Sequence, residues 1–360
     1  MPRRAGPAAP ACRPFQSSLL QSSPLPNKVQ RAAVTTTFFL DVPDAALADW
    51  RALDPDREPQ RLVLGEHYWI VLSYLRLRAA GLDVRLDNDV PATGPVLFYA
   101  GDKRALWRRC RRNRSRALLV AVRSDRHPVG FADVEVVQNA ESADGRRALH
   151  VPHWSQPGLV ARDPARGDRP RTILYPGTPR NLHPGFNEAA WLEFLDRHGL
   201  RFQCHAAAAD GTPPDYHDFR EVDLLLATRP SGARLVRNKP AWKLFNAWLA
   251  GVPALLGPES GYRELREGPL DFIEVDGPDA AMVEIGRLLD DPGLYRAMVD
   301  NGLRRGAGFT DAATAGRWRL LIEDVLEPRA RQLAGRPAPG WRRRARDLSM
   351  RLRRALHGKG

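Results

Sequence analysis

RNKPAWKLFNAWLAGVPALLGPESGY (Arg237–Tyr262) contains the signals for a helix, a turn, a strand and a loop in succession. Residues 241–250 predict a helix, because apolar side chains recur on one side at helical spacing: Leu244, Phe245, Trp248 and Leu249. Gly251 is a typical helix stop. Residues 253–256 predict a short apolar strand, which Gly-Pro ends, and a polar loop over residues 259–262 follows it.

This order of elements favours a phosphate-bearing ligand. It puts Lys239 and Lys243 at the N-terminal end of the helix and the polar loop at the C-terminal end of the strand. In open α/β sheets ligands bind at such strand ends, and helix N-termini attract phosphate. The stretch therefore predicts half of a nucleotide or phosphate site.

Composition places the chain among globular proteins. Its 360 residues suggest two domains of about 150 residues each, with tails. The apolar fraction is 43%, and no run approaches the roughly 18 apolar residues of a membrane span. The basic N-terminus is broken by prolines and is a poor secretory signal. Three widely separated cysteines suit a reduced compartment and have no metal spacing: Cys12, Cys110 and Cys204. We expect a cytoplasmic protein without a metal site.

The net charge of +13 lies in the tails. Residues 1–33 carry +5 and residues 331–360 carry +9, so residues 34–330 carry −1. A nearly neutral body argues against a specific nucleic-acid-binding protein. Only five basic residues are lysines, which makes the pair Lys239 and Lys243 stand out.

Strand and helix patterns alternate twice along the chain and predict an α/β fold of two Rossmann-like, doubly wound domains. The first strand, TTTFFL, is not followed by G-x-G-x-x-G, which argues against a dehydrogenase. We expect a disordered basic extension (residues 1–33), a first Rossmann-like domain (34–150) and a linker rich in Pro, Gly and Arg (151–171). A second Rossmann-like domain (172–312), a closing helix (313–330) and a basic amphipathic tail (331–360) follow.

The tail has an apolar stripe within an arginine-rich segment. Residues 341–356 place the stripe at helical spacing: Trp341, Ala345, Leu348, Leu352 and Ala355. A basic amphipathic helix of this kind binds an anionic membrane surface. A solvated tail, or a helix packed on the body, is an equal alternative, and RNA binding is a third.

With both halves in view, the chain resembles the GT-B-fold glycosyltransferases, in particular the glycogen-synthase-like retaining group (glycosyl transferases group 1). The resemblance is strongest over residues 170–325. KPAWKLFNAWLAGVPALLGPESGYREL lies where that family has its donor-binding helix, Gly-x-Pro turn, strand and loop. LLDDPGLYRAMVDNGLRR (Leu288–Arg305) resembles the family's late helix pair. The resemblance implies two domains facing a cleft, with the acceptor on the N-terminal side and the nucleotide-sugar donor on the C-terminal side.

The family's E-x7-E motif falls on Asn238 and Asn246, so both carboxylates are replaced by amides. An amide still hydrogen-bonds ribose hydroxyls but supplies no charge. Glu259, at the end of the next strand, is a candidate catalytic carboxylate; the alternative is a solvated loop residue or a helix cap.

Further donor residues follow from the resemblance. In the loop PGTPRNLHP, Gly177 and Arg180 match the family's pyrophosphate-binding loop. Lys239 or Lys243 supplies the lysine that this loop lacks, and charge-assisted contacts to phosphate are strong. Arg229 is another candidate cation at a strand end; for these cations the alternative is a solvated side chain. The loop after the Gly-x-Pro strand adds three donor candidates: Ser260, Gly261 and Tyr262.

On the acceptor side, Asp125 and His127 follow a strand and are candidate catalytic residues, although a lone histidine is more often structural. The function expected is transfer of a sugar from a nucleotide-diphosphate sugar, as co-substrate, to a glycan or lipid-linked acceptor. The resemblance implies a retaining reaction without metal or cofactor, in synthesis of a cell-surface polysaccharide or glycoconjugate. Binding of the tail would place it at the inner membrane face. The alternative is a catalytically silent nucleotide- or glycan-binding protein of the same fold.

Overall fold

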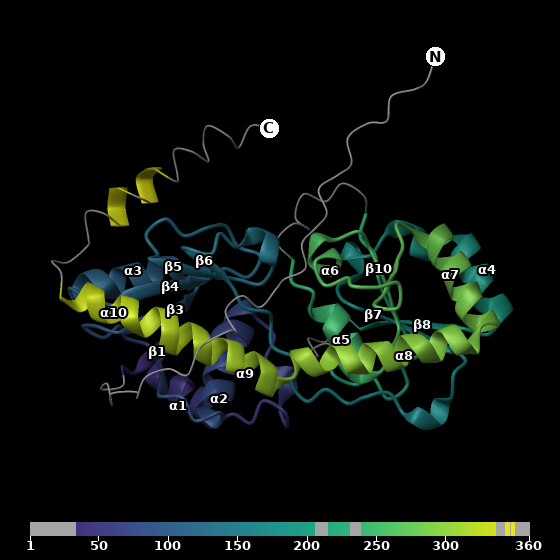
Figure 1. Ribbon diagram of the computed structural model, residues 1–360, viewed down its shortest axis with the longest axis horizontal. Coiled ribbons are helices and arrows are strands. Elements are labelled where there is room, and N and C mark those ends of the chain that lie inside the picture. The colour runs from purple at the N-terminus through teal and green to yellow at the C-terminus, as the bar shows by residue number, and fades with distance from the viewer. Residues whose placement is uncertain (1–33, 206–214, 231–238, 336–342, 346, 350–360) are drawn as a thin grey trace, which may run out of the picture. The chain divides into compact units, whose positions relative to one another are not determined.

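A computed structural model describes residues 34–205, 215–230, 239–335, 343–345 and 347–349. Asn238 and the extension over residues 1–33 lie outside these ranges. Residues 34–360 contain two parallel sheets with helices packed on their faces (Figure 1). The fold class predicted from the sequence is confirmed.

The N-terminal half is built on six parallel strands in the order β2-β1-β3-β4-β5-β6. They are β1 (Thr36–Phe39), β2 (Val84–Asp87), β3 (Pro95–Tyr99), β4 (Leu118–Val122), β5 (Val134–Val137) and β6 (Ala148–His150). β3 and β4 are fully buried on both faces, as their continuous apolar runs predict. The helices between them are α1 (Asp44–Ala52), a helical run that begins as a π-helix at His67–Val71 and continues as α2 (Leu72–Ala79), and α3 (Lys103–Arg112).

The C-terminal half is built on five parallel strands in the order β11-β10-β9-β7-β8. They are β7 (Thr172–Pro176), β8 (Arg201–His205), β9 (Leu224–Ala227), β10 (Ala254–Leu256) and β11 (Ile273–Glu274). Its helices are α4 (Ala189–His198), α5 (Trp242–Ala250), α6 (Ser260–Arg263), α7 (Pro278–Asp290) and α8 (Pro292–Gly306). Gly251 ends α5 in the left-handed conformation, with φ 68°, as the sequence predicts.

Short 3-10 turns complete the connections: Pro59–Arg61, Ala100–Asp102, Ala140–Ser142, Pro164–Arg166, Pro179–Asn181, Pro184–Asn187 and Ala307–Phe309. In each sheet the strand order reverses once, between β1 and β3 and between β7 and β9. At such a reversal the connections on either side leave in opposite directions and open a crevice at the carboxyl ends of the strands. Ligand-binding residues are therefore expected just after β7 and β9.

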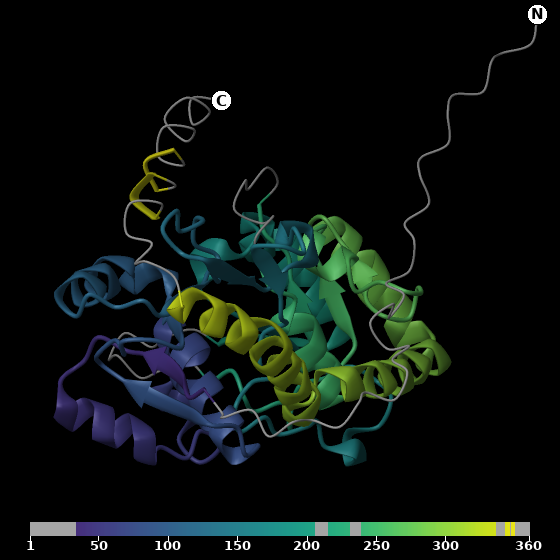
Figure 2. The same cartoon turned by 60° about the vertical axis from the view of Figure 1, so that its left-hand side comes forward.

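The last long helix returns to the N-terminal half. It runs through α9 (Asp311–Leu320), a π-helical stretch (Leu321–Leu326) and α10 (Glu327–Ala334). Trp318, Ile322 and Leu326 are buried in the N-terminal core with Phe38 of β1. Figures 1 and 2 show this run beside the strands of the N-terminal half. This run includes residues 313–330, where the sequence predicts a closing helix, and its packing against the first half had not been predicted.

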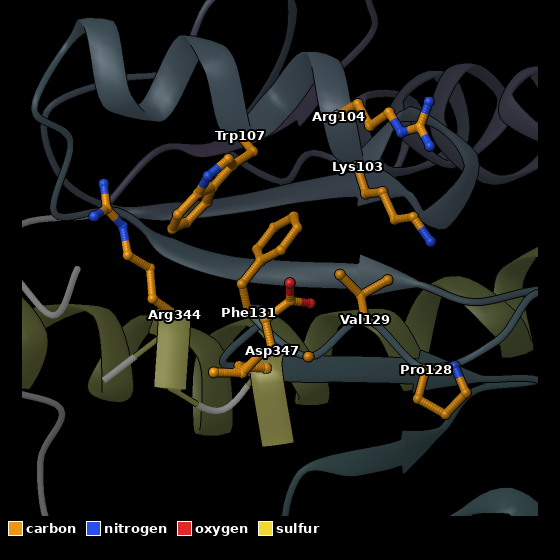
Figure 3. A pocket seen from close by; sticks show the side chains of 10 residues that line it. Lys103, Arg104, Trp107, Pro128, Val129, Phe131, Arg344 and Asp347 are labelled. Carbon is orange, nitrogen blue, oxygen red and sulfur yellow. The ribbon is translucent and has the colours of Figure 1, made fainter. Parts of the chain in front are cut away.

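A C-terminal segment also packs on the N-terminal half. Arg343 is 2% exposed, donates a 2.7 Å hydrogen bond to the carbonyl of Ala117 and pairs with Asp133. A Cβ atom on Gly130 would lie 2.4 Å from the Cα of Asp347, so the segment passes directly over this glycine. Figure 3 shows this neighbourhood. Of the predicted apolar stripe, Ala345 and Leu348 are exposed, and the other three members lie outside the described residues.

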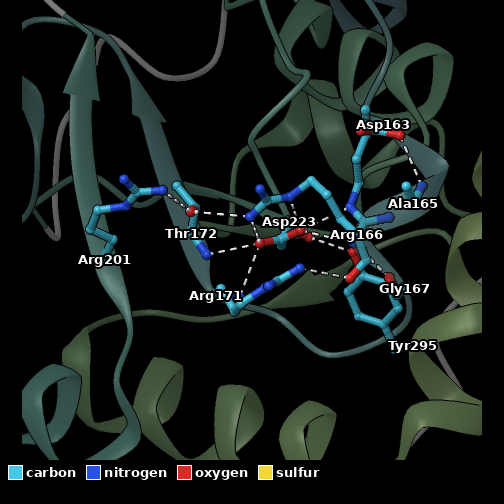
Figure 4. A network of polar contacts seen from close by, with 10 residues as sticks. Asp163, Ala165, Arg166, Gly167, Arg171, Thr172, Arg201, Asp223 and Tyr295 are labelled. Atoms are coloured by element: carbon cyan, nitrogen blue, oxygen red, sulfur yellow. Dashed lines mark hydrogen bonds and ion pairs between the residues drawn. The ribbon is translucent and has the colours of Figure 1, made fainter.

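The predicted linker is tied to the C-terminal sheet by a buried carboxylate (Figure 4). Asp223 is fully buried and pairs with Arg162 at 2.8 Å and with Arg166 at 2.6 Å. It also accepts hydrogen bonds from the backbone N–H groups of Arg171 and Thr172. Burial opposes the charge of this carboxylate, but the arginines and N–H groups outweigh it and lower the pKa of Asp223. This network fixes where β7 begins.

Candidate functional site

A cavity of about 290 Å³ lies between the two halves, at the carboxyl ends of β7 and β9. We call it the cleft cavity. The C-terminal half contributes residues of the loop after β7, of the segment that follows β9, and of the approach to and first turn of α5: Gly177, Thr178, Asn181, Arg229, Lys239, Pro240, Trp242 and Lys243. The N-terminal half contributes the loop after β4 and the entry to α2: Ser124, Asp125, Val63, Gly65, Tyr68 and Trp69. The site lies where the strand order of the C-terminal sheet predicts it.

Gly177 gives the cavity a floor made of backbone. A Cβ atom at this position would lie 3.0 Å from the hydroxyl of Tyr175 and 3.3 Å from the Nζ of Lys243. A side chain here would therefore displace one of these groups. The glycine leaves room for a group to approach the main chain while the lysine amine stays close. The donor-binding role of Gly177 stays a prediction.

Lys243 is a buried cation. Its side chain is 7% exposed, and its Nζ lies 4.7 Å from the centre of the Tyr175 ring. Burial, followed by the charge of nearby Arg229, lowers the pKa of Lys243 to about 7. The amine therefore titrates near neutral pH. An anion entering the cavity would restore its charge.

Lys239 connects the two halves. Its Nζ lies 2.7 Å from Oδ2 of Asp125, although the two residues are 114 positions apart in sequence. The pair is partly exposed, with 26% of the lysine side chain and 41% of the aspartate side chain accessible. Burial opposes the charge of the carboxylate, but the hydrogen bond from Lys239 outweighs it and lowers the pKa of Asp125. The structure thus brings a predicted donor residue and a predicted catalytic residue together.

Arg229 is held by Glu259. Its Nε lies 3.0 Å from Oε1 of the carboxylate, which is 5% exposed. Burial raises the pKa of Glu259, against the opposing charges of Arg229 and Lys243. Glu259 occupies the N-cap position of α6 but makes no side-chain cap hydrogen bond. It does not line the cleft cavity, and its contact orients Arg229, which does.

Asn246 lies behind the cavity wall. It is 1% exposed, and its Oδ1 accepts a 3.0 Å hydrogen bond from the backbone N–H of Gln156. Among the described residues its Nδ2 has no hydrogen-bond partner. The side chain therefore links α5 to the linker and does not reach the cavity surface. Asn238, the first position of the same E-x7-E motif, lies outside the described residues.

The loop into α6 contacts the N-terminal half. Ser260 accepts a 3.2 Å hydrogen bond from Nδ2 of Asn139. A Cβ atom on Gly261 would lie 2.5 Å from the carbonyl of Lys239, so only glycine fits there. Tyr262 is 3% exposed and packs in the C-terminal core. None of these three side chains lines the cleft cavity, and Gly261 acts on the site through the backbone beside Lys239.

Two other predicted residues lie on the surface. Arg180 and His127 are exposed and do not line the cleft cavity. Arg180 is in the 3-10 turn after β7, where Asn181 lines the cavity instead. Their donor-binding and catalytic roles remain predictions.

An aromatic wall was not predicted. His153 is enclosed by aromatic rings, with centroids at 4.4 Å for Trp69, 5.5 Å for Tyr68 and 6.4 Å for Trp242. Burial lowers the pKa of His153 to about 4, so this histidine is neutral at physiological pH. These residues come from the π-helical turn before α2, the linker and α5. No spacing in the sequence shows that they meet.

No protein-family model matches the sequence, and no curated protein matches it. The structure is similar to that of sucrose-phosphate synthase from Thermosynechococcus elongatus, with a TM-score of 0.51 and 11% identity over 81% of this chain and 99% of that chain. The structure of HepE from Anabaena in complex with UDP and glucose matches with a TM-score of 0.48 and 12% identity over 81% of this chain and 100% of that chain. At such identities the likeness concerns the fold alone, which is that of the GT-B glycosyltransferases.

Proposed function

We propose that this GT-B-fold chain is a glycosyltransferase that moves a sugar from a nucleotide-diphosphate sugar to a glycan or lipid-linked acceptor. One observation carries the proposal. Arg229, Lys239 and Lys243 converge with the backbone at Gly177 on a single cavity at the strand reversal of the C-terminal sheet. Three cations around a side-chain-free floor are suited to a diphosphate.

The cations also suit the chemistry of sugar transfer. When the bond between the sugar and the diphosphate breaks, negative charge develops on the leaving phosphate. Donors placed in advance around that charge lower the barrier, and they act more strongly in a water-poor cavity. Arg229 is oriented by Glu259 at 3.0 Å, so its guanidinium is fixed before the donor arrives. We assign Glu259 a positioning role.

The protonation of Lys243 depends on whether the donor is bound. Its pKa is about 7, because burial disfavours the charged amine. A diphosphate beside the amine favours the charged form and raises this pKa. Donor binding is therefore accompanied by proton uptake above about pH 7, and the lysine is fully charged when the leaving group forms.

Lys239 exchanges partners when the donor binds. Its Nζ pairs with Asp125 at 2.7 Å. A diphosphate carries more charge than one carboxylate and competes for the ammonium group. Asp125 is then released on the N-terminal side of the cavity, where we place the acceptor. There it can accept a hydrogen bond from the attacking hydroxyl.

We further propose a retaining reaction that does not require a metal, as the family resemblance implies. In such a reaction the donor phosphate takes the acceptor proton, so the protein need not supply a nucleophile. The three cations neutralise the diphosphate in place of a metal. Synthesis of a cell-surface polysaccharide or glycoconjugate is the expected setting. The part of the chain that the structure describes contains no helix with the length and hydropathy of a membrane span.

A catalytically silent binding protein is the second candidate. The replacement of both motif glutamates by Asn238 and Asn246 favours it, because a carboxylate that stabilises charge is lost. Asn246 now holds the linker through Gln156 at 3.0 Å. This arrangement preserves the shape of the site without supplying charge.

Isothermal titration with a panel of nucleotide sugars, paired with an assay for released nucleotide, separates the two candidates. The glycosyltransferase predicts binding of one donor class with slow release of nucleotide, accelerated by acceptor. Tight binding without sugar loss under all acceptors would favour the silent protein. Absence of binding by the whole panel would contradict both.

A further inference from the structure

A second cavity, of about 360 Å³, lies on the N-terminal half between α3 and the C-terminal segment. We call it the α3 groove. Lys103 and Trp107 of α3 face Phe131 and Val129 of the loop after β4, and Arg344 and Asp347 border the other side (Figure 3). None of these residues lines the cleft cavity.

The groove is a built feature of the fold. Its loop side is packed: Val129 is 2% and Phe131 is 6% exposed. The ring of Phe131 lies 4.8 Å from that of Trp107 and stacks on Phe98 of β3 at 5.9 Å. Its other side is the C-terminal segment, which buried Arg343 anchors to Asp133 and to Ala117.

The outer face of α3 is a stripe of cations around one aromatic ring. Arg104, Trp107, Arg108 and Arg111 lie at i, i+3, i+4 and i+7 and therefore share one side of the helix. The opposite side buries Leu106 and Cys110 in the core. The three arginines are exposed, and none has an acidic partner within 4.0 Å among the described residues. This stripe continues to the groove through Trp107 and Arg104.

The α3 groove and the stripe beside it combine apolar and cationic surface. Leu348 lines the groove and is 59% exposed, and Trp107 is partly exposed between arginines. Trp is favoured at membrane interfaces because its ring is apolar and its N–H is polar. Arginine side chains bury their stems along apolar surface and keep the charge in water. A soluble phosphate would use the cations but would leave the apolar lining without a partner.

We propose that the α3 groove and the arginine stripe beside it bind the anionic phospholipids of a membrane surface. The head-group phosphate lies among Lys103, Arg104 and Arg344, and the apolar part of the lipid contacts Trp107 and Leu348. Charge complementarity favours this occupant, because the stripe and groove contain four basic residues of α3 and Arg344 with one acidic residue, Asp347. The site is separate from the proposed sugar transfer and does not depend on it.

The test uses the full chain and vesicles of phosphatidylcholine with or without phosphatidylglycerol. The main variant replaces the stripe: Arg104→Gln, Arg108→Gln and Arg111→Gln. A matched control removes three exposed arginines outside the N-terminal half: Arg169→Gln, Arg197→Gln and Arg287→Gln. Both variants have the same net charge, and neither alters the arginine-rich tail. Thermal unfolding and circular dichroism establish that each variant is folded.

We expect co-sedimentation with the anionic vesicles only. Each basic residue near an anionic surface is worth about a fivefold change in partitioning, so the stripe variant should bind about a hundredfold more weakly. The control variant should change little, and added salt should weaken binding. Trp107→Ala should weaken binding without changing charge, and Trp107→Phe should restore part of it. Brominated acyl chains should quench wild-type fluorescence more than that of Trp107→Phe.

Four outcomes would overturn the proposal. They are equal vesicle binding by the stripe and control variants, equal binding to vesicles that contain only phosphatidylcholine, unchanged vesicle binding by Trp107→Ala, and complete displacement from vesicles by soluble glycerol phosphate. Retention on a single-stranded RNA oligonucleotide through the same stripe, without vesicle binding, would assign the surface to nucleic acid instead. Loss of vesicle binding with unchanged nucleotide-sugar binding would separate this site from the cleft.

Discussion

Replacing Lys243 by methionine should stabilise the protein and weaken donor binding at the same time. The lysine is 7% exposed and its pKa is lowered from 10.5 to about 7, chiefly by burial. Methionine has a similar length and fills the same space without a charge. The substitution therefore removes the free-energy cost of burying the lysine amine in the folded protein.

The size of the effect follows from the pKa. A fall from 10.5 to about 7 corresponds to about 4 to 5 kcal/mol, at about 1.4 kcal/mol for each pKa unit. Lys243 binds its proton more tightly in the unfolded chain than in the folded one. The unfolded chain therefore holds more protons between pH 7 and 10.5, and the stability of the wild-type protein rises with pH in that window. The cost is fully present below about pH 7.

We expect Lys243→Met to raise Tm by about 5 to 10 °C at pH 6, allowing for imperfect packing of methionine. The gain should shrink as pH rises toward 10. Loss of a charge-assisted contact to phosphate should weaken donor binding by about 10- to 150-fold. Wild-type donor affinity should fall as pH rises above about 7, because the free lysine must then take up a proton. The variant should lack this dependence.

Differential scanning calorimetry and isothermal titration across pH measure both effects. Lys103→Met, outside the cleft cavity, is the matched control and should leave donor binding unchanged. The reasoning is refuted if Lys243→Met lowers Tm while donor affinity and its pH dependence stay the same. That result would mean that the amine is charged and well solvated in the folded protein.

Three further predictions concern the ion pair in the cleft cavity, the linker network and Glu264, a carboxyl group after α6 that accepts a hydrogen bond from the backbone N–H of Ala140. Asp125→Asn should tighten donor binding by about two- to fivefold, because donor binding no longer has to break a partly exposed ion pair with Lys239. The variant should also slow sugar transfer if the carboxylate contacts the acceptor. Titration measures the first effect, and nucleotide-release kinetics measure the second. Asp223→Asn should cost about 3 to 5 kcal/mol of stability by leaving two linker arginines without a charged partner, and an unchanged urea midpoint would contradict this. Burial raises the pKa of Glu264 to about 7 from 4.5, so the folded protein holds this proton more tightly, and wild-type stability should fall as pH rises between these values. Glu264→Gln should flatten that part of the pH–stability profile measured by thermal melts. A variant profile with the same slope as the wild type would contradict the raised pKa of Glu264.

Local signals in the sequence were sufficient for most elements. The helix, turn and strand of residues 241–256 form as predicted, because apolar spacing and the left-handed Gly251 are local features. The three-residue strand β6 was missed because it is too short to show alternation and was assigned to a domain boundary. The predicted linker is also more structured than expected: Trp154 is fully buried and donates a hydrogen bond to Ser73 at 2.8 Å.

Residues that line the cleft cavity were singled out from the sequence where one segment carries them, and were missed where segments from both halves meet. Lys239, Lys243 and Gly177 lie in strand-end or helix-start patterns, and all three line the cavity. The contact between Lys239 and Asp125 depends on how the halves pack, which no local pattern encodes. Asn246 was expected at the donor from its place in a motif, but its position in α5 directs it to the linker.

The most direct measurement of the central claim is donor hydrolysis and transfer by the wild-type chain and by Lys239→Ala, with the nucleotide sugar that binds in titration. The cleft cavity as a donor site predicts that the wild type releases nucleotide, that acceptor accelerates the release, and that Lys239→Ala loses about tenfold or more in kcat/KM while remaining folded. Full hydrolysis and transfer by folded Lys239→Ala would contradict the assignment of the donor phosphate to this cavity.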